Sequence, residues 1–229
     1  MDTHDILRGD HRLPFGLDWT SEAGLEFAIL FQAGKAAVFM DRSYGILVDG
    51  IYRPRASMPN NDGVFLMPMT KSNRERIGRD GTYYPAHTQE IGWLRQGTQD
   101  RSMSGFDSLA EWNEGRGFIE ARIPWGLLNF SDPSSKSIVS TIEGLARGPY
   151  GTPVTDGMRF VLAEYSGDAF GSKAMALRTI PARKNGTIPL PPLFTWKEWD
   201  QPTFHAIRKK SFSIYQEALK RIPGIAQGR

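Results

Sequence analysis

The sequence predicts a mainly β protein: an antiparallel, jelly-roll-like β-sandwich followed by a C-terminal amphipathic α-helix. Three observations predict this class. Short apolar runs recur along the chain, and several alternate with the period of a β-strand. Loops rich in the 24 glycines and 15 prolines separate these runs. A helical apolar period occurs only near the end, so we expect a sandwich domain over 1–194 and a helical extension over 195–229.

The clearest strand signals lie between residues 25 and 40. In the first strand every second residue is apolar, which predicts one buried face: Leu25, Phe27, Ile29 and Phe31. A second apolar run over 35–40 follows Ala33-Gly34. Two such runs around a short connection that contains glycine predict a β-hairpin.

Shorter apolar runs predict the other strands of the sandwich: 64–67, 90–95, 117–123, 158–163 and 174–180. Residues 1–18 and 41–62 are rich in turn-forming residues and predict loops. The polar stretch 70–88 is interrupted by glycines and predicts a long surface excursion.

The C-terminal helix is predicted over 203–221. Apolar side chains recur there close to the helical period, between Pro202 and Pro223-Gly224: Phe204, Ile207, Phe212, Tyr215, Leu219 and Ile222. We expect this apolar face to dock on the sandwich through Phe204, Phe212, Tyr215 and Leu219. A helix lying on a membrane surface is the alternative.

The composition excludes several classes of protein. The absence of cysteine excludes disulfides, thiolate zinc sites, iron–sulfur clusters and a cysteine nucleophile. No apolar run approaches the 18 residues of a transmembrane helix, so we expect no transmembrane segment. The first residues are charged, so we expect no signal peptide in this chain. An extracytoplasmic location then requires a signal in upstream sequence.

The net positive charge of the chain comes from its C-terminal segment. The pI is near 9.2 and the net charge is +3, but residues from Thr195 onward carry seven basic and three acidic side chains. The preceding residues carry 21 basic and 22 acidic side chains. A nearly neutral body lacks the broad basic face that phosphate binding needs, so we expect no nucleic-acid partner.

Two groups of side chains are candidates for ligand binding. Trp112, Tyr83, Tyr84 and Trp19 lie in polar settings, and flat aromatic faces beside polar groups are typical of sugar recognition. Partial burial under a loop is the alternative for each ring. Near the start, Asp2, Asp5 and Asp10 offer oxygen ligands that Ca²⁺ prefers, with a solvated loop as the alternative. We expect no other cofactor.

Catalytic motifs are scarce. The sequence contains no phosphate-binding loop, dinucleotide fingerprint, zincin motif or nucleophile elbow. Glycosidases need two carboxylates across a sugar ring, and Glu120 and Glu26 are strand-borne candidates. Because Arg122 follows Glu120 by two residues, a structural ion pair is the competing interpretation. We therefore favour a protein that is not an enzyme and assign no catalytic residue.

The most specific segment is Phe118-Ile-Glu-Ala-Arg-Ile-Pro-Trp-Gly-Leu-Leu-Asn-Phe-Ser-Asp-Pro-Ser134. It resembles the E-x-R-I-P-W-x-L-L-x-x-x-D-P stretch of bacterial β-sandwich modules related to family 9 carbohydrate-binding modules and DOMON-like domains. The segment 194–202 looks like the W-x-x-W-x-x-P ending of large bacterial proteins that carry this module. We expect Trp125, Leu127 and Leu128 to turn inward and be buried where the strand ends.

The resemblance implies a non-catalytic binding or accessory module, for carbohydrate, within a larger protein or complex. Its alternatives are a glycan-active enzyme that uses a strand carboxylate, or a haem-binding domain. Haem candidates are the histidines together with Met40, Met58, Met67 and Met69. Such modules open with strands that have no counterpart before Met1. We therefore expect an open sheet edge that an upstream polypeptide or self-association covers.

Overall fold

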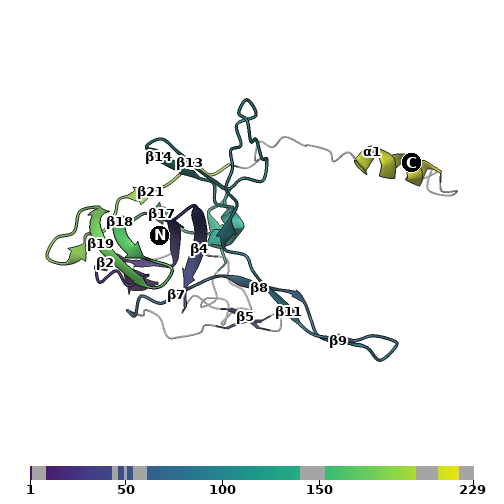
Figure 1. Cartoon of the computed structure of the whole chain (residues 1–229), viewed down its shortest axis with the longest axis horizontal. Helices are drawn as coiled ribbons and strands as arrows, with labels where there is room; N and C mark the ends of the chain where they lie inside the picture. Colours follow the sequence, from purple (N-terminus) through teal and green to yellow (C-terminus); the bar gives the residue numbers. More distant parts are fainter. Residues whose placement is uncertain are drawn as a thin grey trace. The chain divides into compact units, whose positions relative to one another are not determined.

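The computed structural model describes residues 1, 9–42, 46–48, 51–53, 61–139, 153–199 and 211–221. The chain forms two compact units, Met1–Glu198 and Trp199–Arg229. The first unit consists of short, mostly antiparallel sheets in a β-sandwich-like arrangement, and the second contains one short helix (Figure 1). The predicted fold class, mainly β with a C-terminal helix, is confirmed.

The central sheet contains β3 (Phe27–Gln32), β4 (Lys35–Asp41), β7 (Phe65–Leu66) and β12 (Trp93–Leu94). Its strand order is β12–β4–β3, and β7 pairs with the end of β4. The predicted hairpin is β3–β4. Its two turn residues, Ala33 and Gly34, have φ of 52° and 72°. Two positive φ values define the tight turn whose twist matches that of the paired strands.

Both faces of this sheet are buried, whereas the alternation predicted only one. Phe27 and Val38 face one cluster and Leu30 faces the other, because successive side chains of a strand point to opposite faces. The first core cluster comprises Phe27, Ala36, Val38, Leu94, Trp112, Leu128, Phe130, Ile138 and Met158. The second core cluster comprises Leu13, Leu17, Leu25, Leu30, Phe65, Ala169, Ala174 and Ile188.

Two sheets cover the second core cluster. One contains β1 (Asp10–Arg12), β2 (Thr20–Leu25) and β20 (Thr187–Ile188), with β20 parallel to β2. The other is the hairpin of β18 (Leu162–Asp168) and β19 (Lys173–Ile180), which packs on the cluster through Ala163, Tyr165 and Ala174. β19 confirms the strand predicted over 174–180. The single strand predicted over 158–163 is wrong, because the chain divides it between β17 (Met158–Arg159) and β18, which pair in different sheets.

Short elements surround the first core cluster. They are β13 (Trp112–Gly115), β14 (Phe118–Ala121), the 3₁₀ turn η1 (Trp125–Leu128), β15 (Phe130–Asp132), β16 (Ser137–Ile138), β17 (Met158–Arg159) and β21 (Leu193–Phe194). β13 pairs with β14, β15 with β16, and β17 with β21.

The polar stretch 70–88, predicted as a long surface excursion, forms a two-stranded ribbon. It contains β8 (Met69–Asn73), β9 (Arg76–Ile77), β10 (Tyr83–Tyr84) and β11 (His87–Glu90). Every residue from 81 to 90 is exposed, which agrees with a surface excursion. In the region predicted as turns, β5 (Ile46–Val48) also pairs with β6 (Ile51–Arg53).

The C-terminal unit contains α1 (Ser211–Lys220), the described part of the predicted helix. Phe204 lies outside the described residues, and Phe212, Tyr215 and Leu219 are exposed. Docking of this helix on the sheets stays a prediction. Within the described ranges, no helix is long and apolar enough to cross a membrane.

Candidate functional site

Trp112 is a core residue, not the exposed ring that its polar neighbours indicated as a ligand-binding candidate. Its side chain is 3% exposed and lies in the first core cluster. The indole Nε1 donates to the Leu94 carbonyl at 3.2 Å, and the ring lies 5.9 Å from the ring of Phe31. The polar, glycine-rich neighbours that suggested a surface loop instead form the exposed parts of the β13–β14 hairpin.

The other predicted aromatic residues lie on two separate elements. Tyr83 and Tyr84 are exposed in β10, where the Arg76 guanidinium lies 5.1 Å from the Tyr84 ring centre. Trp19 is half-buried against the second core cluster, with the Arg183 guanidinium 4.1 Å from its ring centre. Arginine therefore covers one face of Tyr84 and of Trp19, while Tyr83 is the most exposed ring of the three.

Asp10 is fully buried, and its carboxylate organises backbone. One oxygen accepts the Arg12 N–H at 2.7 Å, and the other accepts the N–H groups of Gly63 at 2.6 Å and Asp62 at 3.2 Å. The pKa of Asp10 is raised to about 6, chiefly by burial. The backbone hydrogen bonds from Arg12 and Gly63 lower it, while the carboxyl groups of Asp62 and Asp41 raise it. The carboxylate thus joins β1 to the 62–63 segment.

The structure describes only one of the three predicted calcium ligands, Asp10. Asp2 and Asp5 lie outside the described residues. In the part of the chain that the structure describes, no three His, Asp or Glu side chains are grouped so that they could hold a metal ion.

The carboxylates considered for glycan hydrolysis and the methionines considered for haem binding lie in several different parts of the structure. Glu120 pairs with the Arg122 guanidinium at 3.0 Å, the structural arrangement that their spacing suggested. Glu26 is fully buried beside β3. Met40 packs against the first core cluster, Met69 is exposed in β8, and Met58 lies outside the described residues.

A row of aromatic side chains, which no local sequence pattern marks as a site, lies beside the first core cluster. It is hereafter called the aromatic row and consists of Phe160, Phe194, Trp196 and Trp125. Neighbouring ring centres are 6.1, 6.2 and 5.1 Å apart in that order. Pairing of β17 with β21 brings Phe160 near Phe194, and η1 supplies Trp125.

Trp125 is 37% exposed, so the prediction that it is buried is wrong. The 3₁₀ turn directs Leu128 into the core instead, while Leu127 is half-buried. Trp125 leans on the buried Phe130 ring at 4.9 Å and on Trp196. Since Phe194 is 53% exposed and Phe160 is also exposed, the row leaves apolar ring surface open to solvent.

A polar loop borders the aromatic row. The Trp196 Nε1 donates to the Pro133 carbonyl at 2.8 Å, and the Lys136 ammonium lies 6.0 Å from the Trp196 ring centre. In the same loop the hydroxyls of Ser134 and Ser135 donate to Asp132 and hold the pKa of that carboxyl below its usual value. Charged and hydroxyl groups therefore lie next to flat apolar surface.

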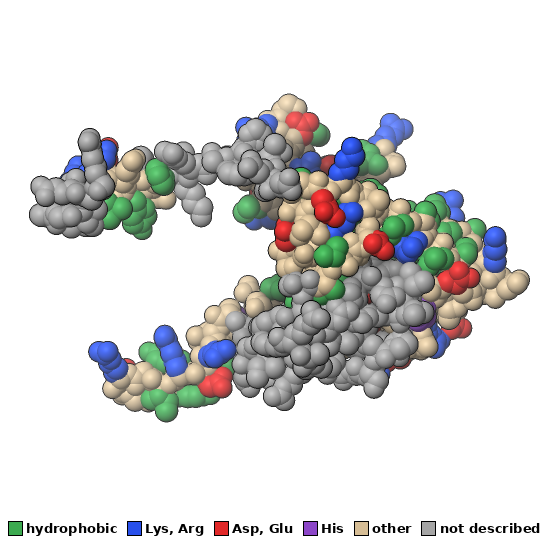
Figure 2. All heavy atoms as spheres, turned by 180° about the vertical axis from the view of Figure 1, so that it is seen from behind, with side chains coloured by type: hydrophobic (Ala, Val, Ile, Leu, Met, Phe, Trp, Pro, Cys, Tyr) green, Lys and Arg blue, Asp and Glu red, His purple; other side chains and the backbone are tan. Residues whose placement is uncertain are grey.

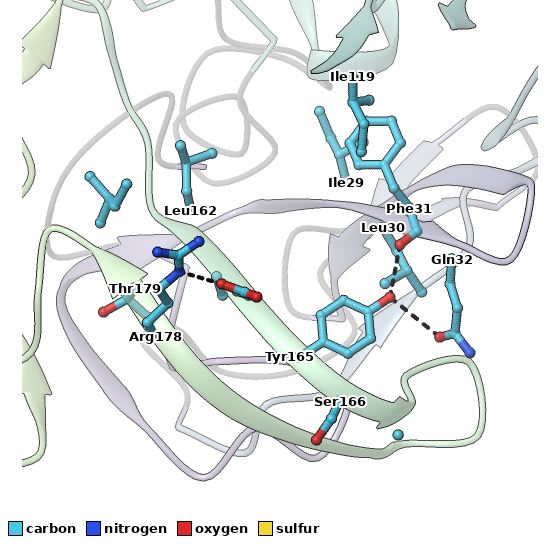
Figure 3. A pocket seen from close by; sticks show the side chains of 14 residues that line it. Ile29, Leu30, Phe31, Gln32, Ile119, Leu162, Tyr165, Ser166, Arg178 and Thr179 are labelled. Carbon is cyan, nitrogen blue, oxygen red and sulfur yellow. Dashed lines mark hydrogen bonds and ion pairs between the residues drawn. The ribbon is translucent and has the colours of Figure 1, made fainter. Parts of the chain in front are cut away.

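The second candidate site is an open groove of about 720 Å³ between β3 and the β18–β19 hairpin (Figure 3). Its apolar walls include Ile29, Phe31, Ile119, Leu162 and Ile180. Its polar groups contact one another: the Tyr165 hydroxyl donates to the Phe31 carbonyl at 2.8 Å, and Glu164 forms an ion pair with Arg178.

These surfaces define the class of the molecule: a β-sandwich-like module with an aromatic surface and an apolar groove. On the face shown in Figure 2, basic and acidic side chains are interspersed among apolar ones. No protein-family model, curated protein or solved structure matches the chain.

Proposed function

We propose that this protein is a non-catalytic carbohydrate-binding module that works as part of a larger protein or complex, and that the aromatic row is its sugar-binding surface. The observation that carries this proposal is the continuity of the row. Four neighbouring rings, each 5 to 6 Å from the next, expose apolar surface beside a polar loop.

Sugar rings have both features that this surface complements. The C–H face of a pyranose packs on an aromatic ring, and its hydroxyls require hydrogen-bond partners at the edge of the contact. Trp125 and Phe194 supply the apolar part. The loop of Asp132, Ser134 and Lys136 supplies an anionic acceptor, a hydroxyl and a cation next to Trp196.

The carboxylates near both candidate sites favour binding over hydrolysis. Glycoside hydrolysis needs an acid and a second carboxylate about 5–10 Å apart. Asp132 is the one carboxylate of the described 132–136 loop, and serine hydroxyls hold it ionised. In the groove, Glu164 is the one carboxylate among the described lining residues, and it pairs with Arg178.

A glycan array followed by titration calorimetry tests the proposal. We expect the full chain to bind a glycan, and Phe194→Ala and Trp125→Ala to weaken that binding at least tenfold. Tyr83→Ala is the matched control, because Tyr83 is an exposed aromatic residue of the separate ribbon. Thermal unfolding of each variant checks that the fold is retained.

Three results would overturn the proposal. The first is the absence of glycan binding by the unaltered chain. The second is loss of binding in Tyr83→Ala with full binding in Phe194→Ala, which would place the sugar on the ribbon. The third is release of reducing sugar from a bound glycan, which would make the protein an enzyme.

A further inference from the structure

The edge of β3 that faces the groove carries backbone groups directed away from β4. β3 is the last strand in the order β12–β4–β3. In an antiparallel pair, alternate residues direct their N–H and C=O groups to opposite sides. The Phe27 carbonyl accepts from the Met1 nitrogen and the Phe31 carbonyl accepts from the Tyr165 hydroxyl, so both point outward. Ile29 lies midway between them and has the same orientation.

One backbone already pairs with this edge. The Met1 nitrogen donates to the Phe27 carbonyl at 2.7 Å, and the Phe27 N–H donates to the Met1 carbonyl at 3.1 Å. Two reciprocal bonds between opposite residues are the pattern of an antiparallel strand pair. A strand that continued this pairing along β3 would lie opposite Ile29, beyond which the Phe31 carbonyl already accepts from the Tyr165 hydroxyl. Among the described residues, no strand pairs with β3 there.

The walls of the groove fit the side chains of such a strand. Phe31 and Ile29 form one wall with Ile119, and Leu162 lies on the hairpin side (Figure 3). Ile180, the cross-strand partner of Leu162, also lines the groove. Leu162 is 61% exposed and Ile180 is 65% exposed. Large apolar side chains around an open strand edge are the arrangement that recruits an added strand.

We propose that the groove is the acceptor site for one extended strand of a partner polypeptide. The strand runs antiparallel to β3 and places apolar side chains at alternate positions against Phe31, Ile119 and Leu162. Its backbone donates to the Ile29 carbonyl and accepts from the Ile29 N–H, the same reciprocal pairing that Met1 makes with Phe27 one position along the edge. This site is separate from the aromatic row and does not depend on it.

The geometry favours a partner over a second copy of this chain. The strand that enters must be a single extended segment, because β18 borders the groove on the side opposite β3. In a second copy, β3 cannot supply this segment, because it belongs to a sheet with a core cluster on each face. That strand cannot enter the groove without its sheet.

Amide hydrogen exchange on the full chain tests the proposal. The probe is a blocked peptide of alternating threonine and valine with a lysine at each end, and the control peptide has glycine and serine in place of these residues. We expect the Thr-Val peptide to slow exchange of the Ile29 amide at least tenfold and the control peptide to leave it unchanged. In the free chain, the Ile29 amide should exchange faster than the Leu30 amide, which faces β4.

Two surface variants locate the contact. Leu162→Lys should weaken peptide binding at least tenfold, because the charge enters the apolar groove. Met175→Lys is the matched control, since Met175 is 64% exposed on the same hairpin but does not line the groove. Unchanged Ile29 exchange with the Thr-Val peptide, or equal effects of both variants, would overturn the proposal. Protection of Ile29 in a dimer that forms without peptide would also overturn it, with a second copy as the occupant.

Discussion

The β3–β4 and β18–β19 hairpins have similar backbones and different surroundings. The first has six cross-strand pairs and the second has seven. Side chains from both faces of β3–β4 enter core clusters. Only one face of β18–β19 does so, while its other face exposes Leu162, Met175 and Ile180. The same local architecture thus serves as an inner layer in one place and as a surface in the other.

The sequences of the two hairpins explain part of this difference. β3 reads Phe-Ala-Ile-Leu-Phe-Gln, an almost continuous apolar run that suits a strand buried on both faces. β18 mixes apolar residues with Glu164, Ser166 and Asp168, which suits a strand with one solvated face. The exposed apolar residues of β19 do not follow this pattern. Of these, Ile180 lines the groove to which we assign the partner strand, whereas Met175 does not.

The largest expected difference between the hairpins is in the cost of removing a side chain. Phe27→Ala should lower the free energy of unfolding by about 3–5 kcal/mol, because the ring is 1% exposed and its loss leaves a cavity. Ile180→Ala should cost less than about 1 kcal/mol, because most of that side chain already contacts solvent. Denaturant unfolding measures both. Equal costs would mean that β18–β19 is buried in solution.

The second test uses the buried carboxyl group of Asp10, which lies near Asp41 of β4. The pKa of Asp10 is raised to about 6 from the ordinary 3.8. Between these values native Asp10 keeps a proton that the unfolded chain has lost. The free energy of unfolding should therefore fall as the pH rises from about 4 to 6, by about 2 kcal/mol.

Asp10→Asn should remove this part of the pH dependence, because asparagine does not titrate. The control is Glu164→Gln on β18. Because Glu164 is exposed, this substitution should leave the pH dependence that Asp10 gives to the free energy of unfolding intact. Unfolding by denaturant at several pH values measures the difference. A wild-type stability that rises between pH 4 and 6, with the rise absent in Asp10→Asn, would contradict the burial of this charge.

The smallest expected effect concerns the turn of the inner hairpin. Ala33 has a left-handed φ of 52°, which is costly for a residue with a Cβ and less so for asparagine. Ala33→Asn should therefore raise the free energy of unfolding by about 0.5–1 kcal/mol. Ala33→Val should lower it, because a β-branched residue fits this φ poorly. Thermal unfolding compares the two, and stabilisation by valine would show a different turn.

Local patterns predicted those elements whose residues are close in sequence. The hairpin over 25–40 followed from alternation and a two-residue turn. The ribbon over 69–90 did not, because its pairing joins polar side chains, which give no apolar period. The second buried face of β3 was also missed, since it depends on β18–β19, which lies more than 130 residues away.

The candidate sites depended even more on distant contacts. Polar neighbours made Trp112 look exposed, but its indole is held by a carbonyl 18 residues earlier. Trp125 looked buried because a strand ends before it, yet the 3₁₀ turn gives the inward position to Leu128. The aromatic row requires the pairing of β17 with β21, and no local pattern specifies that two-residue contact.

The parallel pairing of β2 with β20 affects how the chain reaches its fold. Thr20 lies opposite Thr187, and the Leu190 N–H donates to the Glu22 carboxylate, so this sheet closes over 167 residues. Closing so long a loop is slow compared with forming a hairpin. During synthesis β20 is absent until nearly the whole first unit has left the ribosome, and Ile188 cannot complete the second core cluster before then. While the residues between β2 and β20 are being translated, apolar side chains of this cluster such as Leu25 therefore lie under an incomplete cover, a condition that favours aggregation.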